Sequence, residues 1–222
     1  MTRTQTMKPV LLMIAMAIGV MVQCRTAEAA DRATAVFAGG CFWCVESDFE
    51  SVPGVVEAVS GFTGGHVENP SYRQVTRGDT GHYEAVQITY DPARVSYAEL
   101  LHLFFRSVDP TDPGGQFCDR GDAYRTAVFV ADPAEQAAAE AARAEAQAEL
   151  GAPVVTPVLP QTAFYEAGGK HQDYYKGTRR VITRFGIKQQ ADAYKAYRKA
   201  CGRDRRVRAL WGDEAPFAAH GS

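Results

Sequence analysis

Two cysteines three residues apart are the clearest chemical feature of the sequence, in the run Gly40-Cys41-Phe42-Trp43-Cys44. A glycine pair before Cys41 allows a tight turn from an apolar, strand-like run into a helix. Cys41 would then lie at a helix N-terminus, where unpaired N–H groups and the helix dipole favour the nucleophilic thiolate. The neighbouring aromatic side chains would surround that sulfur. The pattern therefore predicts an activated cysteine in an aromatic pocket, in preference to a buried and inert thiol.

A carboxyl group that could donate a proton lies in a predicted strand over residues 83–90. Glu84 falls on the same, more apolar face as Val86 and Ile88. Burial there would disfavour the carboxylate, raise its pKa and make Glu84 a neutral acid near pH 7. The alternative is a Glu84 at the strand end that simply reaches water, and the pattern alone leaves both open.

Two polar loops contribute tyrosines that could face the same site. Tyr72 leaves the turn at residues 69–72, and Tyr124 follows a loop that begins at Asp119 and enters a predicted strand. Taken singly, each tyrosine is better explained by packing than by catalysis.

The elements that would position these residues mix strands and helices without strict βαβ alternation. Prolines bracket residues 154–158, as expected of an edge strand. Ser96 followed by Glu99 predicts a capping box at the start of a helix. The pattern is typical of a single α+β domain, with a two-layer mixed β-sheet and packed helices. Strands are predicted over residues 33–38, 55–62, 83–90, 124–130 and 154–158, and helices over 41–51, 96–108, 134–150 and 179–199.

Several motifs in a fixed order identify a family. They are GCFW at residues 40–43, GFTGG at 61–65, NPSY at 69–72, GDTGHYEAV at 78–86 and DRGDAYR at 119–125. In these motifs the chain resembles peptide methionine sulfoxide reductases of the A type, from about residue 33 to residue 172. A later block, GGKHQ at 168–172, also resembles that family, and its His171 is interpreted as structural rather than as a base.

The resemblance implies a function for each motif residue. Cys41 is the implied nucleophile that attacks the sulfoxide sulfur, and Glu84 is the acid that protonates the oxygen as the S–O bond breaks. Phe42 and Trp43 are the implied pocket for the methyl group. The substrate implied is the S-epimer of methionine sulfoxide, free or in oxidised proteins, and no metal or other cofactor is expected. The residues implied to orient the oxygen, directly or through water, are Tyr72, Asp119 and Tyr124.

The recycling step depends on the other cysteines. Reduction of the sulfoxide would leave Cys41 as a sulfenic acid, which a thiol must capture before irreversible oxidation. Cys44 is one helical turn away, where side chains approach within ~5–6 Å, and is the predicted resolving cysteine. Cys201 and Cys118 are less favoured as resolving residues, and we expect them to pair with each other. A thioredoxin-like donor would restore the thiols, since an oxidising compartment favours disulfides.

The N-terminus has the pattern of a cleaved signal peptide over residues 1–29. Arg3 and Lys8 precede an apolar run at 10–22, and Ala27-Glu28-Ala29 matches a small-x-small cleavage site. Residues 30–222 would form the catalytic domain, with 179–222 as a helical C-terminal tail. The predicted location is the periplasm, with retention at the membrane by an uncleaved segment as the alternative.

Composition narrows the remaining function classes. The 222 residues carry 24 Lys and Arg against 26 Asp and Glu, a net charge of −2, which argues against nucleic-acid binding. The basic cluster at 203–208 is interpreted as a solvated helix face, and a monomer is expected. A zinc site would need two close cysteine pairs, whereas only Cys41 and Cys44 are close. The alternatives are a thiol–disulfide oxidoreductase using that pair and an exported, disulfide-stapled binding module.

Overall fold

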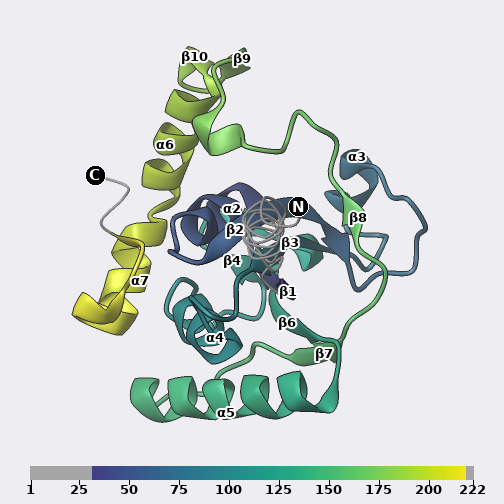
Figure 1. Ribbon diagram of the computed structural model, residues 1–222. Helices are drawn as coiled ribbons and strands as arrows, with labels where there is room; N and C mark the ends of the chain where they lie inside the picture. Colours follow the sequence, from purple (N-terminus) through teal and green to yellow (C-terminus); the bar gives the residue numbers. More distant parts are fainter. Residues whose placement is uncertain (1–31, 219–222) are drawn as a thin grey trace, which may run out of the picture. The chain divides into compact units, whose positions relative to one another are not determined.

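A six-stranded mixed sheet organises residues 32–218, the part of the chain that the computed structural model describes (Figure 1). The predicted signal peptide lies outside these residues. The strand order is β7-β6-β1-β3-β2-β8, and neighbouring strands are antiparallel except for β6 and β7. The strands are β1 (Ala33–Gly39), β2 (Val55–Thr63), β3 (Tyr83–Tyr90), β6 (Thr126–Val130), β7 (Val158–Pro160) and β8 (Tyr165–Glu166).

Three helices share one hydrophobic core with the sheet. Phe49, Leu101 and Ala139, one from each helix, join the same buried cluster as Phe37 of β1 and Val86 of β3. Burial of this apolar surface supplies the main driving force for packing the helices on the sheet. The predicted α+β class is confirmed. The helices are α2 (Phe42–Glu50), α4 (Tyr97–Phe105) and α5 (Pro133–Leu150), and a short helix α3 (Tyr72–Val75) follows β2.

The side chains of β3 alternate between two faces of the sheet, as the period-2 pattern of the sequence predicts. Val86, Ile88 and Tyr90 belong to the large core, whereas Tyr83 and Ala85 join a smaller cluster with Phe129 on the other face. Glu84 therefore points to the side covered by α2, where the apolar surroundings determine its chemistry.

Local signals fix the ends of several helices. The capping box predicted for α4 is present, because Ser96 Oγ accepts from the Glu99 N–H and the Glu99 carboxylate accepts from the Ser96 N–H. Asp132 caps α5 by accepting from two backbone N–H groups, and Gly151 ends that helix in the left-handed conformation.

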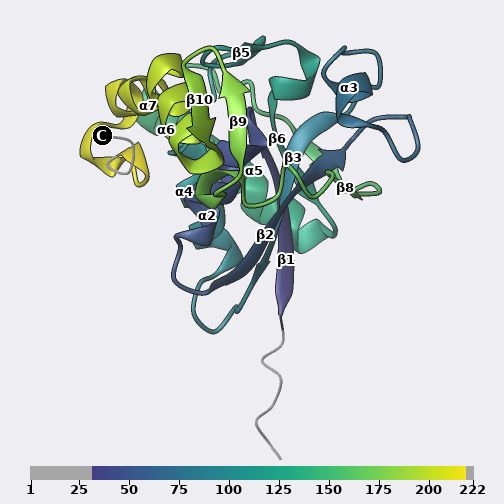
Figure 2. The same ribbon diagram turned by 90° about the horizontal axis from the view of Figure 1, so that it is seen from above.

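The C-terminal segment differs from its prediction at its beginning. Residues expected to be helical from 179 form instead the β-hairpin of β9 (Arg180–Thr183) and β10 (Gly186–Gln189). The β-branched run Val181-Ile182-Thr183 favours a strand, and Gly186, at φ 90°, permits the tight return of the chain. Figures 1 and 2 show the hairpin beside the helix that follows it. The rest is α6 (Gln190–Cys201), α7 (Arg203–Trp211) and the 3₁₀ turn η3 (Gly212–Glu214).

The predicted edge strand is displaced along the chain. It was expected over residues 154–158, but the strand begins at Val158 and continues to Pro160. It does lie at the edge of the sheet, where a proline costs no ladder hydrogen bond on the open side. Within residues 32–218, no helix combines the length and the apolar character that crossing a membrane requires.

Candidate active site

The turn between β1 and α2 positions Cys41. Cys41 is the N-cap of α2, and the preceding Gly40 has φ 81°. A Cβ at Gly40 would lie 2.5 Å from Cβ of Gln116, so a side chain could not be accommodated there. The glycine thus allows the strand to turn directly into the helix, with the Cys41 sulfur at the positive end of the helix dipole.

Glu84 is joined to the same turn. Its Oε2 accepts a hydrogen bond from the Phe42 N–H at 3.1 Å, and the side chain is only 1% exposed. Burial raises the pKa of Glu84 to about 8, against the lowering effect of that hydrogen bond. Its other oxygen, Oε1, has no hydrogen-bond partner among the described residues. Glu84 is therefore a buried acid with a free oxygen, and the alternative that it merely reaches water is wrong.

Cys41 and Cys44 form one titrating unit. The hydrogen bond between them raises the pKa of Cys41 well above its ordinary value, and burial adds to this. The same hydrogen bond lowers the pKa of Cys44 to about 7, with help from Arg203 and Arg198. The pair therefore loses its first proton near pH 7, in an ionisation that belongs to both sulfurs. The helix N-terminus alone therefore does not determine whether Cys41 is a thiolate. Its ionisation depends on the hydrogen bond that it shares with Cys44.

Aromatic rings surround the nucleophile. Trp43 stacks on Tyr174 with ring centroids 3.9 Å apart, and Tyr72 stacks on His171 at 4.3 Å. Phe42 lies 6.1 Å from Tyr72 and 5.6 Å from His171. Burial lowers the pKa of His171 to about 4, so the ring is neutral and its position in the stack agrees with a structural role. Sequence reasoning missed Tyr174, whose only signal was the Asp-Tyr-Tyr run after GGKHQ.

The three polar residues predicted to orient the oxygen lie near Cys41. Tyr72 and Tyr124 are joined by a side-chain hydrogen bond, and burial raises the pKa of each phenol, which keeps both protonated. Asp119 lies in the short strand β5 (Asp119–Arg120), and burial raises its pKa while Arg203 and Arg184 oppose the rise. Tyr72 and Tyr124 are therefore neutral hydrogen-bond donors near the Cys41 sulfur, and Asp119 adds a carboxyl group.

A cavity of about 380 Å³ opens on Cys41 from one side. Trp43, Cys44 and Asp119 line it, together with the Cys118 and Cys201 side chains. Glu84, which accepts from the Phe42 N–H, and the phenols Tyr72 and Tyr124 are not part of this lining. The cavity therefore connects the Cys41 sulfur with the other cysteines.

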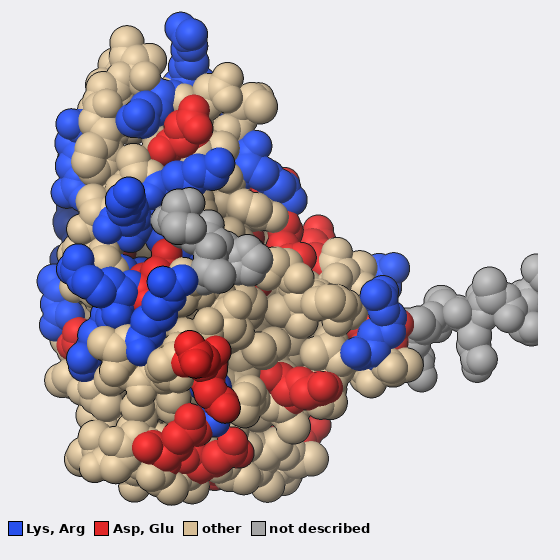
Figure 3. Space-filling model, turned by 90° about the vertical axis from the view of Figure 1, so that its left-hand side faces the viewer, with Lys and Arg blue, Asp and Glu red and all other residues tan. Residues whose placement is uncertain are grey.

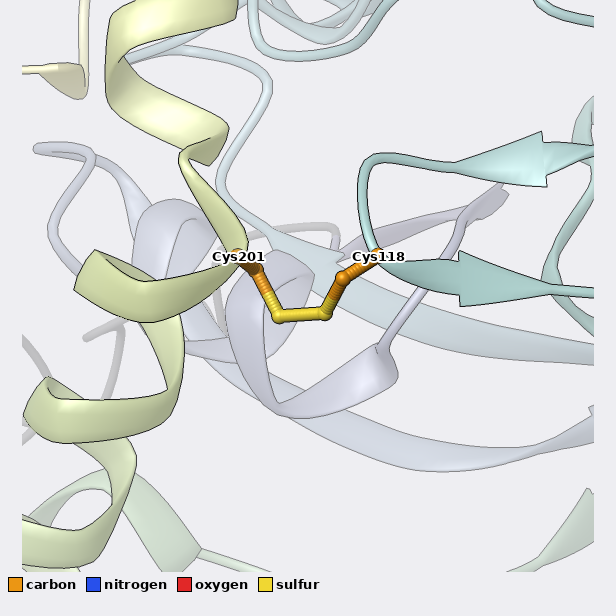
Figure 4. Close-up of a disulfide and its surroundings, with 2 residues drawn as sticks. All are labelled: Cys118 and Cys201. Atoms are coloured by element: carbon orange, nitrogen blue, oxygen red, sulfur yellow. A yellow bond between two sulfur atoms is a disulfide. The ribbon is translucent and has the colours of Figure 1, made fainter.

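Cys118 and Cys201 form a disulfide, with Cα atoms 4.9 Å apart (Figure 4). The predicted pairing is confirmed, and Cys41 and Cys44 are free thiols. Figure 4 shows the bridge joining the end of α6 to the loop before β5. Cys118 is exposed, so a reductant could reach this bridge from solvent.

Buried cations under the cysteine pair were missed by sequence reasoning. Arg203, expected on a solvated face, is only 2% exposed and donates to the carbonyls of Gly39 at 3.1 Å and Ser107 at 2.9 Å. Arg198 donates to Asp48 Oδ1 at 2.6 Å. The long side chains of α6 and α7 thus place positive charge beside Cys44. Their neighbours in the sequence are charged, which concealed the burial.

Two groups of side chains approach the geometry of a metal site within residues 32–218. The first contains Cys118, Cys201 and Asp119, but its sulfurs are bonded to each other. In the second, Lys176 pairs with Glu50 at 2.7 Å and Asp173 at 2.8 Å. The sulfurs of the first group are therefore held in a disulfide, and Glu50 and Asp173 of the second group are held in ion pairs with Lys176.

Comparison with known proteins agrees with this site. A family model described as peptide methionine sulfoxide reductase matches residues 33–205. A Caulobacter vibrioides protein named peptide methionine sulfoxide reductase MsrA 2 is 48% identical over 208 residues, which are 93% of this chain and 100% of that protein. A Halalkalibacterium halodurans protein named peptide methionine sulfoxide reductase MsrA is 44% identical over 180 residues, 80% of this chain and 96% of that protein.

Solved structures share the fold. Reduced Mxr1 from Saccharomyces cerevisiae superposes with a TM-score of 0.64 at 29% identity, over 67% of this chain and 87% of that chain. Methionine sulfoxide reductase A of Corynebacterium diphtheriae gives 0.61 at 29% identity, over 73% and 85%. The buried acid, the helix-capping cysteine and these matches define one class, and the chain belongs to the peptide methionine sulfoxide reductase family. The resemblance read from the motifs is confirmed.

Proposed function

We propose that this protein reduces the S-epimer of methionine sulfoxide, free or within proteins, to methionine. The observation that carries the proposal is the Glu84–Phe42–Cys41 arrangement, in which a buried carboxyl with a free oxygen is fixed to the turn that holds the nucleophile. A sulfoxide sulfur becomes a good electrophile only when its oxygen accepts a proton. The pKa of Glu84, at about 8, keeps that proton available at neutral pH.

The first step forms methionine and a sulfenic acid. The Cys41 sulfur attacks the sulfoxide sulfur as Glu84 protonates the oxygen, which leaves as water once a second proton is taken up, so that an S–S bonded sulfonium forms. Water then attacks the Cys41 sulfur and breaks this S–S bond, which releases methionine and a proton and leaves Cys41 as the sulfenic acid. The methionine sulfur is reduced by two electrons and Cys41 is oxidised by two. Tyr72 and Tyr124, held protonated by burial, orient the oxygen as hydrogen-bond donors, and Asp119 assists.

The second step forms a disulfide and water. The Cys44 thiolate attacks the Cys41 sulfenic sulfur, and the hydroxyl leaves as water after taking up a proton. Cys44 suits this reaction because Arg203 and Arg198 also act to lower its pKa, and these cations stay beside it after Cys41 has become a sulfenic acid. Cys201 and Cys118 are already joined and would have to be reduced before either could resolve Cys41.

The donor is proposed to be a thioredoxin-like dithiol. Two electrons must enter for each sulfoxide reduced, and a dithiol supplies them by disulfide exchange. The exposed Cys118 supports a route in which the Cys118–Cys201 disulfide and its cavity relay electrons to Cys41 and Cys44. We also propose export to the periplasm after removal of residues 1–29 and action as a monomer. The basis is the sequence pattern of those residues and the internal completeness of the site.

An epimer-resolved assay tests the function. The purified protein, with dithiothreitol, is given the S- and R-epimers of N-acetylmethionine sulfoxide separately, and the thioether is quantified. We expect stoichiometric product from the S-epimer alone. Turnover of only the R-epimer would contradict the assignment. Disulfide exchange without any thioether would instead identify a thiol–disulfide oxidoreductase, and neither reaction would identify a binding module.

A further inference from the structure

The β9–β10 hairpin presents apolar side chains to solvent beside the active-site cavity. Ile182 and Ile187 are directly opposite each other in the register, so they share one face, and they are 89% and 69% exposed. Val181, on the other face, packs beside the cluster that contains Cys44 and Tyr174. The inner face of the hairpin therefore accounts for its attachment to the protein, while nothing among the described residues covers the outer apolar pair.

The hairpin also forms part of the cavity wall. Ile182, Thr183 and Arg184 line the cavity that contains Cys41 and Trp43. The sulfur of a methionine is only three bonds from its own Cα, so a polypeptide whose sulfoxide reaches Cys41 through this cavity would lay its neighbouring residues along the cavity mouth. Those neighbours would meet the hairpin first.

Positive charge on the hairpin is only partly offset within the protein, by Asp119, whose pKa Arg184 acts to lower. Arg184 stacks over Phe185 at 4.9 Å and Tyr197 at 5.2 Å, which fixes its guanidinium by cation–π contacts. Among residues 32–218, no carboxylate forms an ion pair with Arg184, Arg180 or Lys188. Figure 3 shows basic side chains gathered over the upper part of the face that carries the hairpin and α6, with acidic ones below. Such a wall favours an acidic partner.

We propose that the β9–β10 hairpin is the subsite for residues flanking the oxidised methionine in polypeptide substrates. Ile182 contacts an apolar neighbour and Arg184 pairs with an acidic one. The proposal rests on the sulfoxide reductase function argued above. A protein reductant docking at the exposed Cys118, which lines the same cavity, is the alternative that the test below distinguishes.

Matched substrates test this subsite. The probes are two acetylated pentapeptides that differ only in glutamate or lysine beside a central methionine sulfoxide, and N-acetylmethionine sulfoxide as the substrate without flanking residues. All assays use the full chain with dithiothreitol, and a parallel series replaces it with thioredoxin. The variants are Arg184→Glu and Ile182→Ser, with Arg180→Glu as control, since it makes the same charge change at an exposed position of the same hairpin that does not line the cavity.

The wild type should prefer the glutamate peptide, and Arg184→Glu should change the glutamate-to-lysine ratio of kcat/KM by about three- to tenfold, mainly through KM. Added salt should reduce this effect. Ile182→Ser should lower kcat/KM for both peptides, relative to N-acetylmethionine sulfoxide, by about fivefold. Arg180→Glu should leave the glutamate-to-lysine ratio unchanged. Melting curves confirm that each variant is folded.

Three results would overturn the subsite. One is an unchanged glutamate-to-lysine ratio in Arg184→Glu together with unchanged kcat/KM for both peptides in Ile182→Ser, and another is an equal loss with N-acetylmethionine sulfoxide. The third is a loss seen only when thioredoxin replaces dithiothreitol, which would assign the hairpin to the reductant. Absence of product from every sulfoxide with the wild-type protein would instead refute the proposed function itself.

Discussion

The active site combines two regions that are built by different means. The turn from β1 into α2 and the adjacent strand β3 hold Cys41 and Glu84 through backbone geometry, with a glycine in the left-handed region and a hydrogen bond from the Phe42 N–H. The C-terminal segment instead acts through long side chains and a disulfide, with Arg203 and Cys201 reaching back to the sheet and to β5. In the proposed mechanism the first region carries the chemistry of sulfoxide reduction, and the second adjusts the charge and redox state around it.

The largest effect is expected at the nucleophile. Cys41→Ser should abolish methionine production, because a hydroxyl is a far weaker nucleophile than a thiolate and no other free sulfur occupies the helix N-terminus. The thioether is measured from the S-epimer with excess dithiothreitol. Substantial residual turnover would mean that the nucleophile lies outside the β1–α2 turn. The two regions could then not be divided into one that reduces the sulfoxide and one that adjusts charge and redox state.

The second effect concerns the acid. Glu84→Gln should lower the rate by about 10²- to 10⁴-fold while keeping some activity, since a positioned proton donor contributes that much. The pKa of Glu84, at about 8, keeps the carboxyl protonated at lower pH and ionised at higher pH. The wild-type rate should therefore fall as pH rises through about 8, and the glutamine variant should lack this fall. An unchanged rate at pH 7 in the variant would remove Glu84 from the acid role.

The third effect distinguishes reduction from recycling. Cys44→Ser should still form one equivalent of methionine with the S-epimer, but turnover with a thioredoxin-like donor should fall severalfold, because the nearby resolving thiol is lost. Peptide mapping of the wild type after one equivalent of sulfoxide, without reductant, should show a Cys41–Cys44 disulfide. A Cys41–Cys201 or Cys41–Cys118 link, with Cys44 free, would make the C-terminal segment the resolving region and Cys44 a packing residue.

The smallest effect on activity is expected from removing the Cys118–Cys201 disulfide. The bridge spans a sequence separation of 83, and its loss in the Cys118→Ser, Cys201→Ser double variant should cost about 2–4 kcal/mol of the free energy of unfolding. Denaturant unfolding measures this cost, and Cys118→Ser alone separates loss of the bridge from loss of both thiols. With dithiothreitol the rate should change little. A large loss of rate in the folded double variant would show that the bridge positions the site directly.

The sequence predicted the first region better than the second for a physical reason. The GCFW run, the face of Glu84 and the Ser96 capping box are local signals, since each depends on residues within one turn or one strand. The burial of Arg203 and the stack of Trp43 on Tyr174 depend on contacts between residues far apart in the chain. No local pattern encodes such contacts.

The errors have the same origin. The hairpin at 180–189 was predicted as part of a helix. Each of its strands has only four residues, which is too short for the spacing of apolar residues to distinguish a strand from a helix. The expected Cys41 thiolate was inferred from the helix N-terminus, whereas the hydrogen bond with Cys44 and the surrounding cations decide the charge of the pair. The pKa values of this pair depend on side chains from several helices, so the sequence around Cys41 alone does not predict them.

Arg203 sets a limit on how the chain could be shortened or rearranged. Its guanidinium donates to the Gly39 carbonyl before the nucleophile, lies 4.9 Å over the Phe117 ring next to Cys118, and approaches Asp48 Oδ2 at 3.8 Å. A fragment ending before residue 203 would leave the buried carbonyls of Gly39 and Ser107 without their donor, at a cost of about 1–3 kcal/mol each, and would leave Asp48 with Arg198 as its ion-pair partner. A minimal enzyme built from this chain must therefore retain the start of α7, however complete the motifs upstream of it are.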